Sequence, residues 1–322
     1  MLYLGSEVGV DVLERLHALP AHEPSEVDPT STAMRPGTPR PQGSILQRYR
    51  SDELVMTDPL LVLPDLAVGV VTDSATVDVV CRERQLAYGS DGPGNFGRTP
   101  YDDYSEHLVA TSAADERPLG SIRLGFGPRL LEHGGFPAFE LSRYWKANQA
   151  PDDFLYSALE ITRVWITRDR VPEYRSILRA LWIGLQGYLG LHSHLDHIIG
   201  AVALVDYPPD AAERVVTHFV RFHPASQTIF SPINPAPAGS VEWHGDADGM
   251  LELEGLNTEL RSRDPRKGVP PLLYLYASVG MNVLADPGYD ETGRGVLIPV
   301  QVSAHNLTDS FEAMRRGLQV TR

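Results

Sequence analysis

The longest patterned stretch of the chain lies between Ala158 and Gly187. Its first part, residues 159–167, is dominated by β-branched and aromatic residues, which are typical of a strand. A charged connection follows, and from about residue 176 to 188 apolar residues recur four apart, which predicts a helix with one buried face. The pattern therefore predicts a strand, a basic loop and a helix in succession.

Similar patterns predict further elements on both sides of this stretch. Ser74 is the expected N-cap of a helix over residues 74–88. The runs 107–111 and 120–126 flank a polar turn and predict an antiparallel pair. Together the elements predict a mixed α/β (α+β) fold, with a mostly antiparallel sheet flanked by helices. Strand-like runs begin near Asp65 and cover residues 107–111, 120–126, 197–205 and 295–303, and helical runs cover 74–88, 211–222 and 270–283.

The start of the chain has a different character. Residues 1–20 predict a short amphipathic, peripheral helix, and residues 21–45 are rich in Pro, Ser and Thr without apolar periodicity. We interpret residues 1–45 as this helix and a flexible tether, and residues 46–322 as one folded domain. Residues 226–249, with several Pro and Gly, predict a long excursion from that domain.

Composition narrows the class of protein. The net charge is -14, which disfavours binding to nucleic acid. No apolar run reaches the roughly 20 residues that a membrane-spanning helix needs. A single cysteine, Cys81, excludes an internal disulfide, and no secretory signal is visible, so we expect a cytoplasmic protein.

One acidic residue, Glu160, interrupts the apolar strand between Leu159 and Ile161. Partial desolvation should raise the pKa of its carboxyl toward the range of a general base. The alternative is a carboxylate paired with Arg163 or Arg123 that holds the sheet together. In a regular strand, Glu160, Thr162 and Val164 would lie on one face. Ile161, Arg163 and Trp165 would lie on the other face.

Six short motifs occur in an order that resembles a known family. They are Arg82-x-Arg84, Tyr101-Asp102-Asp103-Tyr104, His107-Leu108-Val109-Ala110, Gly120-Ser121-Ile122-Arg123-Leu124, Glu160-Ile-Thr-Arg163-Val-Trp165-Ile166 and Leu181-Trp182-x-Gly184. This order resembles the acyl-carrier-protein-dependent N-acyltransferases of the GNAT-like fold. These include N-acyl amino acid synthases, ornithine N-acyltransferases and, more distantly, acyl-homoserine lactone synthases. The resemblance covers roughly residues 75–205, with a weaker echo at 270–302.

The resemblance implies a transfer of a fatty acyl group from a carrier-protein thioester to the amine of an amino acid or similar small molecule. It implies no cofactor or metal beyond the phosphopantetheine-linked donor, and membrane contact only through a lipid product. Arg123 suits an acceptor carboxylate because a guanidinium binds it bidentately. For Asp102 and Asp103, capping of their own loop is an equal alternative. The implied site residues are Glu160 and Arg163 for catalysis, Arg123, Asp102, Asp103 and Arg84 for the acceptor, and Val164, Ile166, Arg175 and Arg179 for the acyl donor.

The connection after the strand bears on the donor. Coenzyme A enzymes of this fold hold the pyrophosphate on a Gly-rich turn at a helix N-terminus, whereas RDRVPEYRS here has no glycine. Between residues 161 and 180, five arginines stand against two acids, a net charge of +3. This patch suits a single phosphopantetheine phosphate and an acidic carrier protein. The alternatives are a solvated helix surface, an acyl-coenzyme A donor, or an acyl-binding protein without catalysis.

Two other groups have candidate chemistry. His192, His194 and His197 with Asp196 are crowded, but no helical ligand spacing accompanies them, so we expect a polar connection and no metal. Cys81 lies in the middle of a predicted helix without an adjacent His, which predicts a small buried side chain and no nucleophile.

Overall fold

The computed structural model describes residues 59–88, 97–148, 151–167, 174–223, 229–236, 249–264, 268–290 and 295–308. The expected N-terminal helix and tether, the domain start at residue 46, the connection 168–173 and much of 226–249 lie outside these residues. The strands are β1 (Leu61–Val62), β2 (Leu66–Val71), β3 (Glu106–Ser112), β4 (Pro118–Phe126), β5 (Trp145–Ala147), β6 (Ala158–Ile166), β7 (His197–Val205), β8 (Phe230–Pro232), β9 (Asn282–Val283), β10 (Gly288–Tyr289) and β11 (Gly295–Ser303). The helices are α2 (Ser74–Tyr88), α3 (Gly127–Gly134), α4 (Asp152–Tyr156), α5 (Tyr174–Leu191), α6 (Pro209–Phe222), α7 (Gly249–Arg263) and α8 (Pro271–Ser278), with the 3-10 turns η1 (Pro100–Asp103), η2 (Phe136–Ala138) and η3 (Glu140–Arg143).

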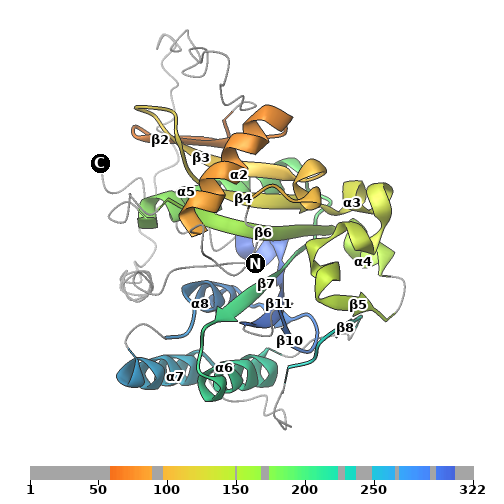
Figure 1. Ribbon diagram of the computed structural model, residues 1–322, viewed down its shortest axis with the longest axis vertical. Coiled ribbons are helices and arrows are strands. Elements are labelled where there is room, and N and C mark those ends of the chain that lie inside the picture. The colour runs from red at the N-terminus through yellow and green to blue at the C-terminus, as the bar shows by residue number, and fades with distance from the viewer. Residues whose placement is uncertain are drawn as a thin grey trace, which may run out of the picture.

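One large sheet runs through the described part of the chain, in the order β1-β2-β3-β4-β6-β7-β11-β10, with β9 on β11 (Figure 1). Its neighbours pair antiparallel except for β6 and β7, which are parallel. This confirms the predicted mixed α/β fold with a mostly antiparallel sheet. The expected pair of strands is β3 and β4, and the predicted runs at 197–205 and 295–303 are β7 and β11, which pair along nine residues.

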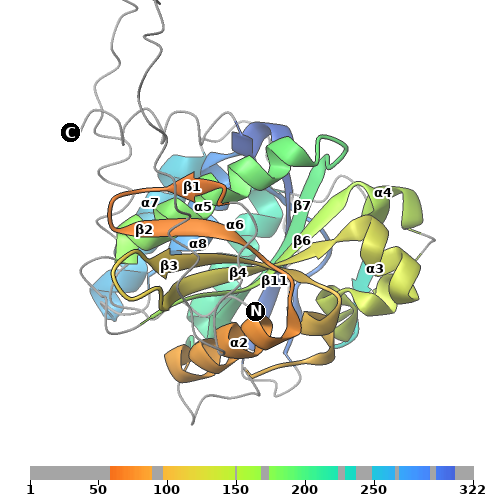
Figure 2. The same cartoon turned by 90° about the horizontal axis from the view of Figure 1, so that it is seen from above.

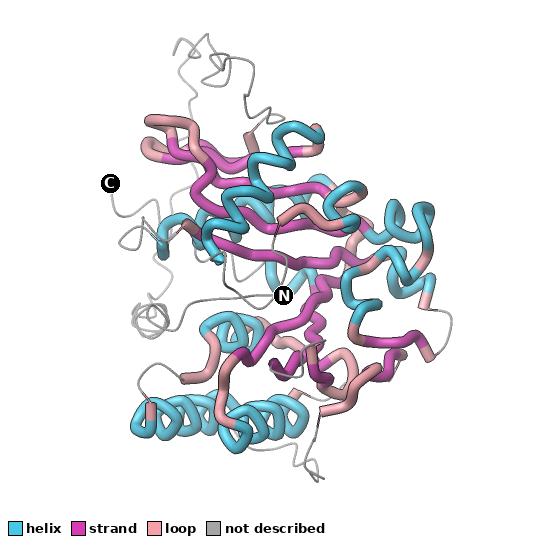
Figure 3. Tube along the Cα trace, viewed as in Figure 1, coloured by secondary structure: helices cyan, strands magenta, loops and turns pink. Residues whose placement is uncertain are grey.

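Helices cover both faces of the first half of the sheet (Figure 2). Helix α5 packs on one face through Ile177, Leu181 and Leu185, all fully buried, as the spacing of four predicted. Helix α2 covers the opposite face through Val77 and Val80. Figure 3 shows α6 and α7 side by side, away from this half, and their apolar residues belong to the same core cluster as those of β7 and β11.

Two helix ends differ from the predictions. The N-cap of α2 is Asp73, whose Oδ1 accepts the Thr76 N–H at 2.9 Å, and Ser74 is the first helical residue. The helix expected over 270–283 ends at Ser278, because Gly280 adopts a left-handed φ of 76° that terminates it. The chain then enters β9.

Strands β6 and β7 separate after a short contact. They pair only from Ala158 opposite His197 to Glu160 opposite Ile199, although each strand is nine residues long. Figure 1 shows them diverging from there. At the point of separation Gly200 lies against Ile161, where an added Cβ would be 2.6 Å from the Ile161 carbonyl oxygen. A glycine is therefore what allows the two backbones to meet before they part.

Strand β6 is irregular, and the predicted alternation of its side chains is wrong beyond Thr162. Thr162 pairs with Arg123 and Trp165 with Ser121, so β6 has one residue more than β4 between these pairs. Arg163 takes a left-handed φ of 53° in this bulge. The faces therefore exchange: Val164 and Ile166 join the core beneath α5 with Ile161, whereas Trp165 packs with α2.

Candidate active site

Arg84 and Asp102 form the first part of a buried group of charges beneath η1. The Arg84 guanidinium donates two bonds of 3.0 Å to the two Asp102 carboxylate oxygens, and neither side chain has exposed surface. Asp102 also accepts the Thr99 N–H at 2.7 Å and the Thr99 hydroxyl at 2.8 Å. Burial alone would raise the pKa of Asp102, but the Arg84 hydrogen bonds and the Arg123 charge outweigh it and hold the pKa below its usual range.

Arg123 on β4 adds a second arginine to this buried group of charges. Its guanidinium donates to Thr162 at 2.9 Å and to Thr99 at 3.1 Å, and reaches Asp102 at 3.5 Å. Its remaining nitrogen is paired with Glu140 of η3. The side chain is 1% exposed. Arg123 is thus held by an acid on each side.

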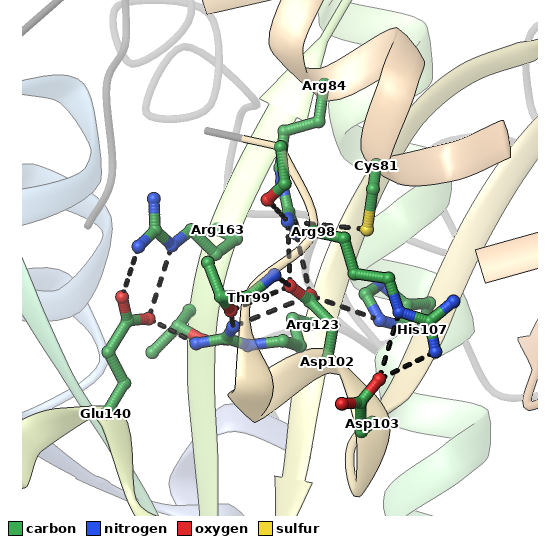
Figure 4. Close-up of polar contacts among 12 residues, drawn as sticks. Cys81, Arg84, Arg98, Thr99, Asp102, Asp103, His107, Arg123, Glu140 and Arg163 are labelled. Carbon is green, nitrogen blue, oxygen red and sulfur yellow. Dashed lines mark hydrogen bonds and ion pairs between the residues drawn. The ribbon is translucent and has the colours of Figure 1, made fainter. Parts of the chain in front are cut away.

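Glu140 is shared between Arg123 and Arg163. Its Oε1 accepts from Arg163 at 2.5 Å, and the half-buried Arg143 lies 3.5 Å from the same oxygen. Burial would raise the pKa of Glu140, but the charges of Arg123 and Arg163 outweigh it and hold the pKa well below its usual range. We call Arg84, Asp102, Arg123, Glu140 and Arg163 the buried charge network (Figure 4).

Glu160 lies beside this network and is bound by backbone groups. Its Oε1 accepts the Leu141 N–H at 2.8 Å, and its Oε2 accepts the Glu140 N–H at 2.9 Å. The residue is 3% exposed. Gly125, which pairs with Glu160 across the ladder, leaves the space that the carboxylate occupies, because a Cβ there would lie 3.3 Å from Oε2.

The protonation behaviour of Glu160 differs from that of its neighbours. Burial raises its pKa to about 7, against the lowering effect of the two N–H bonds and of Arg123. A carboxyl that titrates near neutral pH can accept a proton and release it again under physiological conditions. The raised pKa expected from the sequence is therefore present, together with a near-complete burial that the sequence did not indicate.

The implied acceptor residues have different surroundings. Arg84 and Arg123 are both buried and both pair with Asp102, which caps η1 together with Thr99. Capping is the alternative that the sequence left open for Asp102. Asp103 is exposed and is bound by Arg98 at 2.7 Å. The structure therefore brings Glu160, Arg163, Arg123, Arg84 and Asp102 together and leaves Asp103 at the surface.

The implied donor residues do not form one group among the described residues. The side chains of Val164 and Ile166 are buried in the core, and the Val164 carbonyl accepts the Tyr88 hydroxyl at 2.5 Å. Arg179 on α5 is partly buried, which lowers the pKa of its guanidinium. Arg175 lies in the first turn of α5, and its side chain is outside the described residues.

Sequence reasoning missed Glu140, the acid that joins Arg123 to Arg163. Its signal was present, because Glu140 stands between Phe139 and Leu141 as Glu160 stands between Leu159 and Ile161. The segment around Glu140 has no regular periodicity, so the sequence predicts no element there that would single out its acid. Thr99, which bonds both Asp102 and Arg123, was missed as well.

The other candidates are structural in the described residues. Cys81 is buried, burial raises the pKa of its thiol to about 11, and Arg84 donates to its sulfur at 3.4 Å. In the crowded histidine segment, His192 packs on Tyr188 and Phe126, and His197 stacks on Phe154. Across the part of the chain that the structure describes, no group of three metal-ligand side chains is placed to hold an ion.

Half-buried aromatic residues lie over the network. The Arg123 guanidinium stands 5.5 Å from the centre of the Tyr101 ring, and Tyr101 contacts Tyr104 edge to face. Desolvation raises the pKa of both phenols, with Glu160 adding to the effect. Both phenols are therefore neutral at physiological pH.

Comparisons with known proteins give weak likenesses. The sequence matches no protein-family model and no curated protein. Among solved structures, a CoA-dependent acyl-homoserine lactone synthase, MesI, is similar with a TM-score of 0.33 and 12% identity, over 74% of this chain and 84% of its own. The CoA-dependent synthase BjaI gives 0.36 and 12% over 73% and 80%, and the acyl-homoserine lactone synthase LasI gives 0.38 and 10% over 74% and 90%. Structural similarity this low does not assign an activity to the chain, so a proposal about its function depends on its own side chains.

No helix in the described ranges combines the length and the apolar character that crossing a bilayer requires.

Proposed function

We propose that this protein is an acyltransferase that passes a fatty acyl group from a carrier-protein thioester to the amine of a small molecule, with Glu160 as the general base. The observation that carries the proposal is the carboxyl of Glu160, buried yet titrating near neutral pH, at the residue where β6 stops pairing with β7. Beyond Glu160, β6 and β7 no longer pair with each other. A base at this position therefore lies beside the point where the two strands separate.

The proposed reaction needs one proton acceptor. The amine nitrogen attacks the thioester carbonyl, the C–N bond forms as the C–S bond breaks, and the pantetheine sulfur leaves as a thiol with the second proton that the nitrogen loses. Glu160 takes the proton of the amine, which lets the nitrogen lone pair attack. Glu160 is 3% exposed and both of its oxygens already accept N–H bonds. In this proposal a water molecule therefore carries the proton from the amine to Glu160.

The buried charge network has a supporting role in this proposal. Arg123 and Arg163 are engaged by Glu140, so they fix the site and do not meet an acceptor carboxylate directly. Arg143 is the half-buried cation nearest the network and is the better partner for an acceptor acid group. The basic connection and Arg175 remain the proposed contact for the donor's phosphate, and no resident cofactor or metal is proposed.

The experiment that tests the proposal compares the full chain with Glu160→Gln. Purified protein is given acyl-carrier protein with a mixture of amino acids and related amines, and N-acylated products are sought by mass spectrometry. Product from the wild type and its loss of at least about 100-fold in Glu160→Gln supports the proposal. Equal activity in the two proteins would remove Glu160 as the base, and equal rates with acyl-coenzyme A would remove the carrier-protein donor.

A second function is favoured by one observation. Both Glu160 oxygens are used by the backbone of η3, as in a carboxylate whose role is to hold a turn. In that case the protein binds an acyl chain without catalysis. Binding of acyl-carrier protein with no product from any amine would support this second function.

A further inference from the structure

Glu140 and Glu160 are a pair of buried acids with opposite properties. Each stands between two apolar residues, and they are 1% and 3% exposed. The pKa of Glu140 is held well below its usual range, whereas the pKa of Glu160 is raised to about 7. The difference follows from their partners: Glu140 meets guanidinium groups, and Glu160 meets neutral N–H groups.

Glu140 is attached to the site in two ways. Its carboxylate is paired with Arg123 of β4 and with Arg163 of the β6 bulge. Its backbone N–H and that of Leu141 donate to the two oxygens of Glu160. The same residue therefore contacts both arginines through its side chain and Glu160 through its backbone.

We propose that Glu140 is the positioning residue of the site: it anchors η3 on Arg123 and Arg163 so that the η3 backbone holds the Glu160 carboxylate, and it offsets the arginine charge that Glu160 meets. The inference rests on the proposed role of Glu160 as the base. Glu140 does not touch the reacting atoms and acts through Glu160 alone.

The balance of buried charges supports this role. Three arginines of the network stand against two firmly ionised acids, Asp102 and Glu140, which leaves one positive charge that an ionised Glu160 neutralises. The charged and titratable groups that act on Glu160 come from the elements packed on its strand. They are Arg123 on β4, Glu140 on η3, and Tyr101 and Tyr104 in and after η1.

Removal of the Glu140 charge should therefore make Glu160 ionise more readily. Glu140→Gln keeps the volume and can still accept a hydrogen bond from either arginine, but leaves a second uncompensated positive charge beside Glu160. We expect the pKa of Glu160 to fall by on the order of one unit.

The test is a pH titration of the full chain by infrared difference spectroscopy, with the Glu160 carboxyl band assigned by its loss in Glu160→Gln. Glu140→Gln should shift the midpoint of this band to lower pH. Glu259→Gln, which removes the same charge from an arginine pair at the surface of α7, should leave it unchanged. A midpoint in folded Glu140→Gln equal to that of the wild type would overturn the proposal.

Glu140→Asp keeps the proposal testable if Glu140→Gln does not fold. It retains the charge but is one methylene shorter, so it cannot reach both arginines without moving η3. The η3 N–H bonds lower the pKa of Glu160, so weakening them should raise the midpoint of its band, and an unchanged midpoint would contradict the proposal. The readout needs no substrate, so a shifted band in a protein without acyltransferase activity would reject the proposed function and leave the positioning role standing.

Discussion

Two sets of ion pairs in this protein use the same residue types in opposite surroundings. The buried charge network lies in the first half of the sheet, where its side chains are 0–4% exposed. On α6 and α7, Glu259 joins Arg214 and Arg263 at the surface, where side-chain exposure is 39–56%. Surface pairs contribute little to stability, whereas buried ions lose their hydration and are often no better than apolar residues of the same size. Solubility is enough to explain the surface pairs. The burial of the charge network, in contrast, requires an explanation other than solubility.

The largest expected effect breaks the network at its centre. Arg123→Leu leaves Glu140 and Asp102 buried with fewer compensating charges, so the free energy of unfolding should fall by about 3–5 kcal/mol. Urea unfolding followed by circular dichroism measures it. Arg214→Leu is the matched surface change and should cost at most about 1 kcal/mol. Similar losses in the two variants would show that the two sets do not differ energetically.

The next effect concerns pH. The pKa of Glu160 is raised from 4.5 to about 7, so between these values the folded protein binds more protons than the unfolded chain. Stability therefore decreases as the pH rises from about 4.5 to about 7, by about 3 kcal/mol in total. Glu160→Gln removes this dependence. The quantity to measure is the difference in free energy of unfolding between the two proteins at several pH values.

Subtraction of the variant is necessary because His107 opposes this trend. Burial lowers the pKa of His107 to about 3, so the folded protein binds fewer protons there and stability rises with pH between about 3 and 6.5. This contribution is common to the wild type and Glu160→Gln. If the difference between the two proteins is constant across pH, the raised pKa of Glu160 is wrong.

A smaller effect is expected where β6 and β7 meet. In Gly200→Ala the new methyl group would lie 2.6 Å from the Ile161 carbonyl oxygen, so the strands must shift. We expect a loss of about 1–3 kcal/mol in the free energy of unfolding, measured by thermal and urea denaturation. Gly255→Ala on α7, where nothing lies within 4 Å of the added Cβ, is the control and should be neutral or slightly stabilising. Equal behaviour of the two variants would mean that the close approach is relaxed in solution.

The smallest effect is expected from Glu259→Gln. It removes one partner of two exposed arginines, so the free energy of unfolding should change less than in Arg123→Leu or Gly200→Ala, and this change should shrink in high salt. A loss as large as that of Arg123→Leu would show that the surface pairs stabilise the fold as much as the buried network does.

The fold was more predictable than the site, for a physical reason. Strands such as β7 and β11 are long, continuous apolar runs, and hydrophobic periodicity specifies such elements directly. Glu160 and Arg123 were visible because acids and arginines within apolar segments are unusual, whereas Arg84 was indicated only by the family resemblance. Their partners were not visible, since pairing depends on which strands lie side by side.

Two residues show what the sequence did not reveal. Arg163 adopts a conformation that usually favours glycine, and an arginine gives no sign of such a bulge. Glu140 lies in a short 3-10 turn without periodicity, so its position opposite Arg123 and Arg163 follows only from the tertiary structure. Both misses concern backbone geometry that is set by contacts distant in the sequence.

The extra residue in β6 makes the length of this strand as important as its composition. Straightening the bulge with all of its residues kept would restore a regular pleat opposite β4 and invert every side chain that follows. The indole of Trp165 would then turn toward α5 and the branched chain of Ile166 toward α2. A single-codon deletion of Arg163 would instead leave every later side chain on its present face, because it removes the residue that the bulge accommodates.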